Sequence, residues 1–406
     1  MSEVISLRSI TSKIGSGATP KGGNTVYENS GIAFIRSQNV LDMSFSTQNL
    51  AYITNEQANK LNNVIVENND ILLNITGDSI ARCTIVPDEL LPARVNQHVS
   101  IIRCISPDYA NYVCYYLQFL KPYLLQICKV GGTRNALTKE AIENLPIVIQ
   151  KEYKKIGNLL STIDQKITLN NQINEELEAM AKTLYDYWFV QFDFPDENGK
   201  PYKSSGGKMV YNDQLKREIP EGWGVKLLGE LSTYVTDKIS SNDLNSKNYI
   251  GTDNMLSNMK GIEQATYLPN STLVNSFIPN DILIANIRPY FKKIWISDRT
   301  GGCSSDVLCL RANDKEICNY LFYSLARDDF FNYNVTGSKG SKMPRGDKAH
   351  IQKYSVLFSE KHALKFSKLV SNFISQKHLI YKQNQELSQL RDWLLPMLMN
   401  GQVKVE

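Results

Sequence analysis

Two sets of polar residues in this chain have the types and spacing needed to read the edges of DNA bases. Their side chains match the donors and acceptors of base edges, and they stand on loops that follow predicted strands. In the first half the candidates are Arg36, Ser37, Gln38, Asn39, Asn74, Thr76, Arg82, Asn96, Gln97, His98, Thr133 and Arg134. In the second half they are Thr252, Asn254, Asn286, Arg288, Tyr290, Lys292, Ser304, Ser305, Lys339, Lys342 and Arg345.

These candidates form four clusters in each half of the chain. The glycine-rich, basic loop 337–345 and its counterpart 131–134 are expected to contact phosphates, and the clusters of Arg, Gln and Asn to contact bases. For any single residue, a solvated loop is the alternative. The recurrence of the clusters at equivalent places favours DNA binding for the set as a whole.

No constellation for catalysis accompanies these clusters. The chain has no Pro-Pro pair, so it lacks the Asp/Asn-Pro-Pro-aromatic turn of amino-directed DNA methyltransferases, and it has no ATP-binding G-x-x-x-x-G-K-[ST] loop. Metal-dependent cleavage needs clustered carboxylates with a lysine. The nearest residues, Asp108 with Glu152 and Lys154, are far apart in the sequence. We therefore expect no catalytic residue, no metal site and no cofactor in this chain.

The composition limits the possible environments. A formal charge of +4, from 45 basic and 41 acidic residues, excludes a purely electrostatic, histone-like binder. No apolar run approaches the roughly 18 residues that span a bilayer, and the N-terminus lacks a signal-peptide pattern. The seven cysteines form no C-x-x-C pair. They predict reduced, mostly buried thiols in a cytoplasmic protein. From the lack of a long apolar run we expect no membrane partner.

An internal repeat organises the elements that must position the polar clusters. Four landmarks recur in the same order at offsets between 208 and 215 residues. They are 34–40 with 249–255, 69–72 with 280–283, 96–99 with 304–307, and 174–177 with 384–387. The apolar scaffold is kept while the polar residues differ, which favours two copies of one fold with two different targets. A tandem duplication without a difference in function is the alternative.

Each half predicts short strands, helices with aromatic stripes and one long closing helix. The runs 31–35, 70–73, 83–86 and 99–102 have the β-branched composition and the length of strands. The aromatic segments 111–117 and 319–325 are interpreted as core helices rather than as base-stacking surfaces. The segment 191–223, rich in Pro, Gly and Ser, is interpreted as a connector.

The two long helices carry heptad seams. The apolar steps alternate between four and three residues over 151–190 and again over 361–406. The seam positions we single out are Ile163, Ile167, Asn174, Leu177, Phe373, Ile380, Asn384 and Leu387. Two such helices in one chain favour an intramolecular antiparallel pair, although either helix could pair with another protein. A helix of about 37 residues spans on the order of 55 Å, longer than a DNA turn of about 34 Å, so the pair could act as a ruler.

The sequence resembles the specificity subunits of type I restriction–modification systems along nearly its whole length. The most specific likeness lies in the central segment 159–167 and in 181–195. The segments 31–39 and 394–401 and the two Asn-Asp-Ile-Leu repeats also look like the family.

The resemblance implies an α+β fold. Two homologous mixed α/β target-recognition domains, 1–150 and 224–360, would be separated by two long helices that form an antiparallel coiled coil with pseudo-two-fold symmetry. It also implies that the partners are double-stranded DNA with a bipartite target, two methyltransferase subunits and the restriction/translocase subunits. Methyl donor, ATP and metal would then be used by those partners. An orphan or regulatory DNA-binding or scaffold protein of the same architecture is the alternative.

Overall fold

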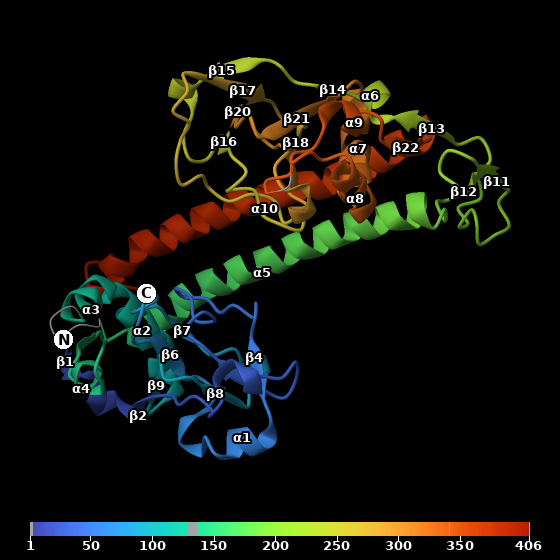
Figure 1. The fold of residues 1–406 in the computed structure, drawn as a ribbon. Helices are drawn as coiled ribbons and strands as arrows, with labels where there is room; N and C mark the ends of the chain where they lie inside the picture. The colour runs from blue at the N-terminus through green and yellow to red at the C-terminus, as the bar shows by residue number, and fades with distance from the viewer. Residues whose placement is uncertain (1–2, 129–135, 341, 406) are drawn as a thin grey trace. The chain divides into compact units, whose positions relative to one another are not determined.

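The computed structural model describes residues 3–128, 136–340 and 342–405 (Figure 1). The chain divides into two compact units. Unit 1 comprises Met1–Asn171 together with Lys382–Glu406, and unit 2 comprises Gln172–Tyr381.

Unit 1 contains two four-stranded sheets. The first has the antiparallel order β2 (Thr11–Ser16), β9 (Val99–Cys104), β6 (Ile71–Asn74) and β7 (Cys83–Ile85). The second has the order β4 (Ala51–Ile53), β3 (Ile32–Ile35), β8 (Ala93–Val95) and β5 (Ile65–Val66), and β3 runs parallel to β8. The remaining elements are β1 (Glu3–Ser6), which pairs with β10 (Pro146–Ile149), and the helices α1 (Asn55–Asn59), α2 (Pro107–Phe119), α3 (Lys121–Ile127) and α4 (Lys139–Glu143).

Unit 2 repeats this arrangement. Its first sheet has the order β14 (Ser232–Tyr234), β21 (Val307–Ala312), β18 (Ile282–Ala285) and β19 (Ile294–Ile296). The second has the order β15 (Lys238–Ser240), β17 (Leu273–Phe277), β20 (Gly301–Cys303) and β16 (Tyr249–Ile250), and β16 runs parallel to β20. The short helices are α6 (Leu228–Leu231), α7 (Cys318–Leu325), α8 (Asp328–Thr336) and α9 (Lys348–Ile351). The unit also contains two antiparallel strand pairs. One is the hairpin of β11 (Met209–Asn212) with β12 (Arg217–Pro220), and the other joins β13 (Gly224–Leu227) to β22 (Ser355–Phe358), which is distant in the sequence.

The two units differ at one sheet edge. The strands β3, β8 and β5 correspond to β16, β20 and β17 in order and direction. Unit 1 adds β4 beside β3, whereas unit 2 adds β15 beside β17, at the opposite edge. The predicted repeat is therefore a shared framework with a different edge strand in each copy.

The repeated Asn-Asp-Ile-Leu motif starts a buried strand in each unit. Asn69 and Asn280 have φ angles of 64° and 74°, a left-handed conformation that Asn tolerates better than most residues. The next residue, Asp70, is fully buried. It accepts one hydrogen bond from the Glu67 backbone N–H at 2.7 Å and two from the Arg103 guanidinium at 2.8 Å each.

The second copy of the motif makes the same contacts. Asp281 accepts a hydrogen bond from the Ile278 backbone N–H at 2.9 Å and two from the Arg311 guanidinium at 2.8 Å each. A buried carboxylate is stable only when it is paired and hydrogen-bonded. The motif thus fixes the turn before β6 and β18 and ties it to β9 and β21.

The aromatic stripes of the short helices lie in the cores, as the sequence predicted. In α2, Tyr112, Tyr115 and Tyr116 are buried, and in α7 Tyr320 is fully buried. These rings are therefore unavailable for stacking on bases.

The two long helices are α5 (Tyr153–Tyr185), which a π-helical turn extends through Asp186–Val190, and α10 (Glu360–Met399). Within unit 1, the first part of α5 packs antiparallel to the last part of α10, with Asn170 bonded to Asn384 and Asp164 to Arg391. Within unit 2, the last part of α5 packs antiparallel to the first part of α10, with Glu178 bonded to Lys377. The predicted antiparallel coiled coil is confirmed inside each unit.

The proposed seam residues are buried or half-buried. Ile163 and Leu177 are buried, and the other six, Ile167, Asn174, Phe373, Ile380, Asn384 and Leu387, are half-buried. The ends of both helices also enter a core. Leu398 and Met399 of α10 lie in the unit 1 core, and Trp188 and Phe189 after α5 lie in the unit 2 core.

The segment 191–223 is more ordered than a Pro/Gly/Ser-rich connector requires. It contains the β11–β12 hairpin, and Phe194 stacks on Tyr202 and Trp223 with centroids 4.7 and 4.9 Å apart. All seven cysteines are unpaired. Over the described residues, no helix combines the length and apolarity needed to cross a membrane, and no three His, Cys, Asp or Glu side chains gather into a possible metal site.

Candidate nucleic-acid interface

In unit 1 three of the four polar clusters meet at one place. The backbone N–H of Ile75 donates to His98 O at 3.0 Å, and the Thr76 hydroxyl lies 2.6 Å from His98 Nδ1, which joins cluster 74–82 to cluster 96–98. The Asn74 amide donates to Ser37 O at 2.9 Å, which adds cluster 36–39. Of the fourth cluster, Thr133 and Arg134 lie outside the described residues.

In unit 2 all four clusters meet. The Asn286 backbone N–H donates to Asp306 O at 2.8 Å, and the Arg345 guanidinium lies 3.0 Å from the Asp306 carboxylate. The backbone N–H of Arg288 donates to Pro344 O at 2.8 Å. The Lys293 ammonium donates to Thr252 O at 2.6 Å, which adds the remaining cluster.

Strand direction explains this convergence. Clusters 36–39 and 96–98 follow β3 and β8, which are parallel neighbours, so both clusters leave the same edge of the sheet. Cluster 74–82 follows β6, which is antiparallel to β9, so it lies beside the residues that precede β9. The pairs β16 with β20 and β18 with β21 repeat both relationships in unit 2.

The candidates differ in exposure. Eight side chains are exposed: Gln38, Gln97, His98, Tyr290, Ser305, Lys339, Lys342 and Arg345. Nine are half-buried: Arg36, Ser37, Thr76, Arg82, Thr252, Asn286, Arg288, Lys292 and Ser304. Four are buried: Asn39, Asn74, Asn96 and Asn254.

The four buried amides, which we expected among the base contacts, bond to the backbone of the loops in this structure. Asn39 Oδ1 accepts from the Arg36 backbone N–H at 3.1 Å, and Asn254 Oδ1 accepts from the Gly251 backbone N–H at 2.6 Å. Each Nδ2 of this pair donates to two further backbone carbonyls. Asn74 and Asn96 likewise bond to loop backbone. Since the same donors and acceptors serve a turn or a base, the sequence could not separate the two roles.

Several cations of unit 2 are already paired with carboxylates. Lys292 lies 2.7 Å from Asp328, and Lys339 lies 2.6 Å from Asp347. The hydrogen bond from Lys339 lowers the pKa of Asp347 to about 2. By contrast, Arg82, Arg288 and Lys342 have no side-chain ion pair within the described part of the chain. Of these three, Lys342 is exposed, and Arg82 and Arg288 are half-buried.

A comparison with protein families adds an independent observation. Residues 2–179 match the family described as the type I restriction modification DNA specificity domain. This part of the chain is therefore similar to that family. The matched segment contains the unit 1 clusters 36–39, 74–82, 96–98 and 131–134, and the repeat gives unit 2 the same framework.

Two curated proteins show which members this chain is similar to. The type I restriction enzyme MjaIX specificity subunit of Methanocaldococcus jannaschii is 27% identical over 64% of this chain and 61% of its own length. The type I restriction enzyme HindI specificity subunit of Haemophilus influenzae is 21% identical over 67% of this chain and 72% of its own length. This chain thus spans about three fifths of the MjaIX subunit.

A solved structure has the same fold. The crystal structure of the S subunit of a type I restriction–modification system from M. genitalium matches with a TM-score of 0.56 and 14% identity, and it covers 97% of this chain and 95% of that chain. At this identity the likeness concerns the fold alone. It confirms the predicted α+β architecture with two repeated domains and two long helices.

Residues beyond the predicted clusters also lie beside the convergence point in unit 2. In unit 2 a polar cavity of about 270 Å³ lies beside Ser304 and Ser305, and Lys238, Asn270 and Asn275 contribute to its wall. The strand register places Lys238 opposite Asn275 and Asn275 opposite Cys303, which immediately precedes the serines. The sequence did not single these residues out, and the edge strand β15 has no counterpart beside β5 in unit 1.

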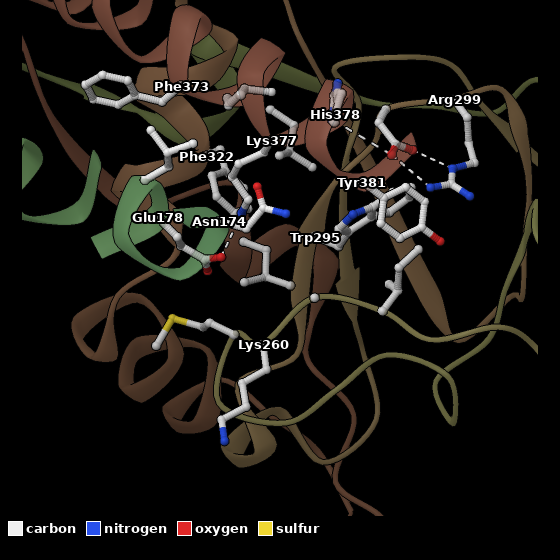
Figure 2. A pocket seen from close by; sticks show the side chains of 18 of the residues that line it. Asn174, Glu178, Lys260, Trp295, Arg299, Phe322, Phe373, Lys377, His378 and Tyr381 are labelled. Atoms are coloured by element: carbon white, nitrogen blue, oxygen red, sulfur yellow. Dashed lines mark hydrogen bonds and ion pairs between the residues drawn. The ribbon is translucent and has the colours of Figure 1, made fainter. Parts of the chain in front are cut away.

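A second cavity, of about 350 Å³, lies in unit 2 between α5, α10 and β19 (Figure 2). Trp295 and Phe373 give it apolar walls, and the Oδ1 atom of Asn174 on its wall is buried without a partner among the described residues. Its charged groups are mostly paired, as Lys377 is with Glu178 at 2.7 Å. It shares no residue with the four clusters, so we do not include it in the interface.

Proposed function

We propose that this chain is the DNA-reading specificity subunit of a type I restriction–modification complex, and that each unit reads one half of a bipartite duplex target. The observation that carries the proposal is the convergence of equivalent polar loops in two repeated units. The family match over residues 2–179 and the specificity-subunit names of the similar proteins support it.

The two reading surfaces differ in character. The unit 1 surface presents neutral polar groups, chiefly Gln38, Gln97 and His98. The unit 2 surface presents Tyr290, Lys342 and Arg345. Different side chains on one framework would read different base sequences, while phosphate contacts would contribute affinity without discrimination. Two half-sites of unlike sequence follow from this difference.

The chemistry of the complex would belong to its partners. Two methyltransferase subunits and the restriction/translocase subunits would supply methyl transfer, ATP use and cleavage, and this chain would be non-catalytic. The seven unpaired cysteines fit a reducing, cytoplasmic setting for such a complex.

A methylation map of host DNA tests the proposal. Maps would be compared between cells with the gene, without it, and with the gene carrying Gln38→Ala. We expect deletion to abolish methyl-adenine at one split motif. We expect Gln38→Ala to relax the sequence of only one half, because a base contact contributes about 1–3 kcal/mol of discrimination.

The matched control removes two exposed charges away from the clusters. The double variant Lys200→Ala/Lys203→Ala should leave the motif and its methylation unchanged. A methylation map that does not change when the gene is deleted would contradict the proposal. The alternative function, that of an orphan or regulatory DNA-binding or scaffold protein, would then be tested.

A further inference from the structure

Two aromatic side chains project from the reading loop of unit 2. Tyr290 and Phe291 lie in a single 3-10 turn, Pro289–Phe291, between β18 and β19. They are 48% and 40% exposed, and their ring centroids are 4.8 Å apart. Pro289 beneath them is buried, so the turn is anchored while its two rings face outward.

The turn that carries the rings is held in a strained conformation. Arg288 and Lys292, on either side of it, have φ angles of 51° and 53°, in the left-handed region that residues other than glycine rarely adopt. Such conformations persist only where surrounding contacts enforce them, and they gather at ligand-binding sites.

Neighbouring loops enforce this conformation. The Asn258 and Met259 backbone N–H groups donate to Phe291 O at 2.9 Å and Lys292 O at 2.8 Å. On the other side, the Arg288 N–H donates to Pro344 O at 2.8 Å. The ion pair of Lys292 with Asp328 fixes the turn to α8. These contacts hold the turn that carries the two rings in a fixed conformation.

The rings lie within the proposed interface rather than beside it. Pro344, which accepts the Arg288 bond, belongs to the basic glycine-rich loop, and Lys293 bonds to Thr252 of another cluster. Arg288, Lys292 and Lys293 flank the two aromatic residues in the sequence, and the Lys293 ammonium lies 5.9 Å from the centre of the Phe291 ring. The corresponding loop of unit 1, 75–82, contains no aromatic residue.

We propose that Tyr290 and Phe291 form a wedge that inserts at a base step of the half-site read by unit 2 and unstacks it. The inference rests on the proposed function. Apolar side chains that enter a base step kink the duplex by about 20–90°. Aromatic rings replace part of the lost stacking, and the flanking cations offset the phosphate charge that the bend brings together. A rigid support matters because a mobile pair of rings would lose conformational freedom on insertion.

The test uses the full complex and a duplex that carries the methylated motif. 2-Aminopurine is placed at each step of both half-sites in turn, apart from the methylated adenine, and end-labelled duplexes report the bend by energy transfer. The wild-type complex should give one bright, unstacked step, in one half-site only. Tyr290→Ser/Phe291→Ser should abolish that signal, reduce the bend and weaken binding about tenfold to a hundredfold.

The matched control is Val210→Ser/Tyr211→Ser, an exposed apolar pair on β11 outside the loops, which should bind and bend DNA as the wild type does. Two results would overturn the wedge and leave the proposed function standing. One is sequence-specific binding by the wild-type complex without any unstacked step. The other is an unstacked step that persists in the Tyr290→Ser/Phe291→Ser variant. A wedge variant that fails to assemble with its partner subunits would instead make the pair a protein contact. Absence of motif-specific binding by the wild-type complex would overturn the proposed function itself.

Discussion

Asn170 of α5 donates a hydrogen bond to Asn384 of α10, with 2.7 Å between Nδ2 and Oδ1, and its side chain is almost fully buried in unit 1. The same Nδ2 lies 2.9 Å from Gln383 Oε1, and Asn384 Nδ2 donates to Asn171 Oδ1 at 2.8 Å. Asparagine side chains that bond across a helix seam are satisfied in only one register. These residues therefore fix how the two helices align in unit 1.

This amide pair predicts a non-additive effect on stability. Asn384→Leu should lower the free energy of unfolding by about 1–3 kcal/mol, because it removes a partner from the buried Asn170 amide. Asn170→Leu/Asn384→Leu should recover most of that loss, since two leucines pack well in a seam. Urea unfolding of the full chain and its single and double variants measures the coupling. Additive losses in the double variant would show that the two amides act independently.

The environment of His362 in unit 2 predicts that the stability of the chain depends on pH. Burial, together with the nearby charges of Lys361 and Lys365, lowers the pKa of His362 from 6.5 to about 4. The imidazole packs against Phe194 and Trp223, with centroids 4.3 and 4.9 Å away. The unfolded chain thus takes up this proton at a higher pH than the folded chain does. The free energy of unfolding should fall as the pH drops from about 6.5 to about 4.

His362→Gln tests this prediction, because glutamine does not titrate. Unfolding curves recorded at intervals across the same pH window should show a smaller loss of stability in the variant than in the wild type. Equal losses in both chains would assign the pH dependence to other groups.

Sequence periodicity was sufficient to predict the framework of this fold. The repeat offsets, the Asn-Asp-Ile-Leu strands and the heptad helices all depend on apolar spacing, which is local and strongly patterned. The partner of each seam asparagine was not predictable in the same way. Asn174 and Asn384 occupy matching seam positions, yet Asn384 bonds to Asn170 and Asn171. The pairing depends on the helix register, which the packing of the whole unit sets.

The candidate site also combines features that the sequence predicts with features that depend on packing. Strand ends correctly located the loops, because strand direction decides which loops share an edge. Burial separated Gln38, which is exposed, from its neighbour Asn39, which bonds to its own loop. The sequence did not single out Phe291, because an exposed phenylalanine in a turn cannot be told from a core phenylalanine until its burial is known.

Substitution of Gly346 should impair the recognition of only the half-site that unit 2 reads. A Cβ atom at this position would lie 2.4 Å from Asn334 Oδ1 and 2.7 Å from Asn286 Oδ1. Both oxygens are buried, so the basic loop that ends at Gly346 would have to move. Gly346→Ala should cost about 1–3 kcal/mol in stability and relax only the half-site read by unit 2. Methylation mapping and thermal unfolding measure the two effects.

Gly224→Ala is the matched control, because a Cβ there meets no atom within 4 Å. It should leave both the motif and the unfolding temperature unchanged. Relaxation of both half-sites by Gly346→Ala would contradict the assignment of this loop to one reading surface.

The helix pair predicts that the length of the unread spacer can be changed by design. Asn170 and Asn384 face each other in unit 1, so insertions after Asn170 and before Asn384 enter the seam at matching points. Seven residues preserve the heptad phase and lengthen a helix by about 10 Å, equivalent to about three base pairs. A chain with both insertions should methylate a motif whose gap is about three base pairs longer, with both half-sites unchanged. A single insertion in α5 should disrupt the seam and abolish methylation. Methylation of the original gap by the doubly extended chain would show that the helices do not set the spacing.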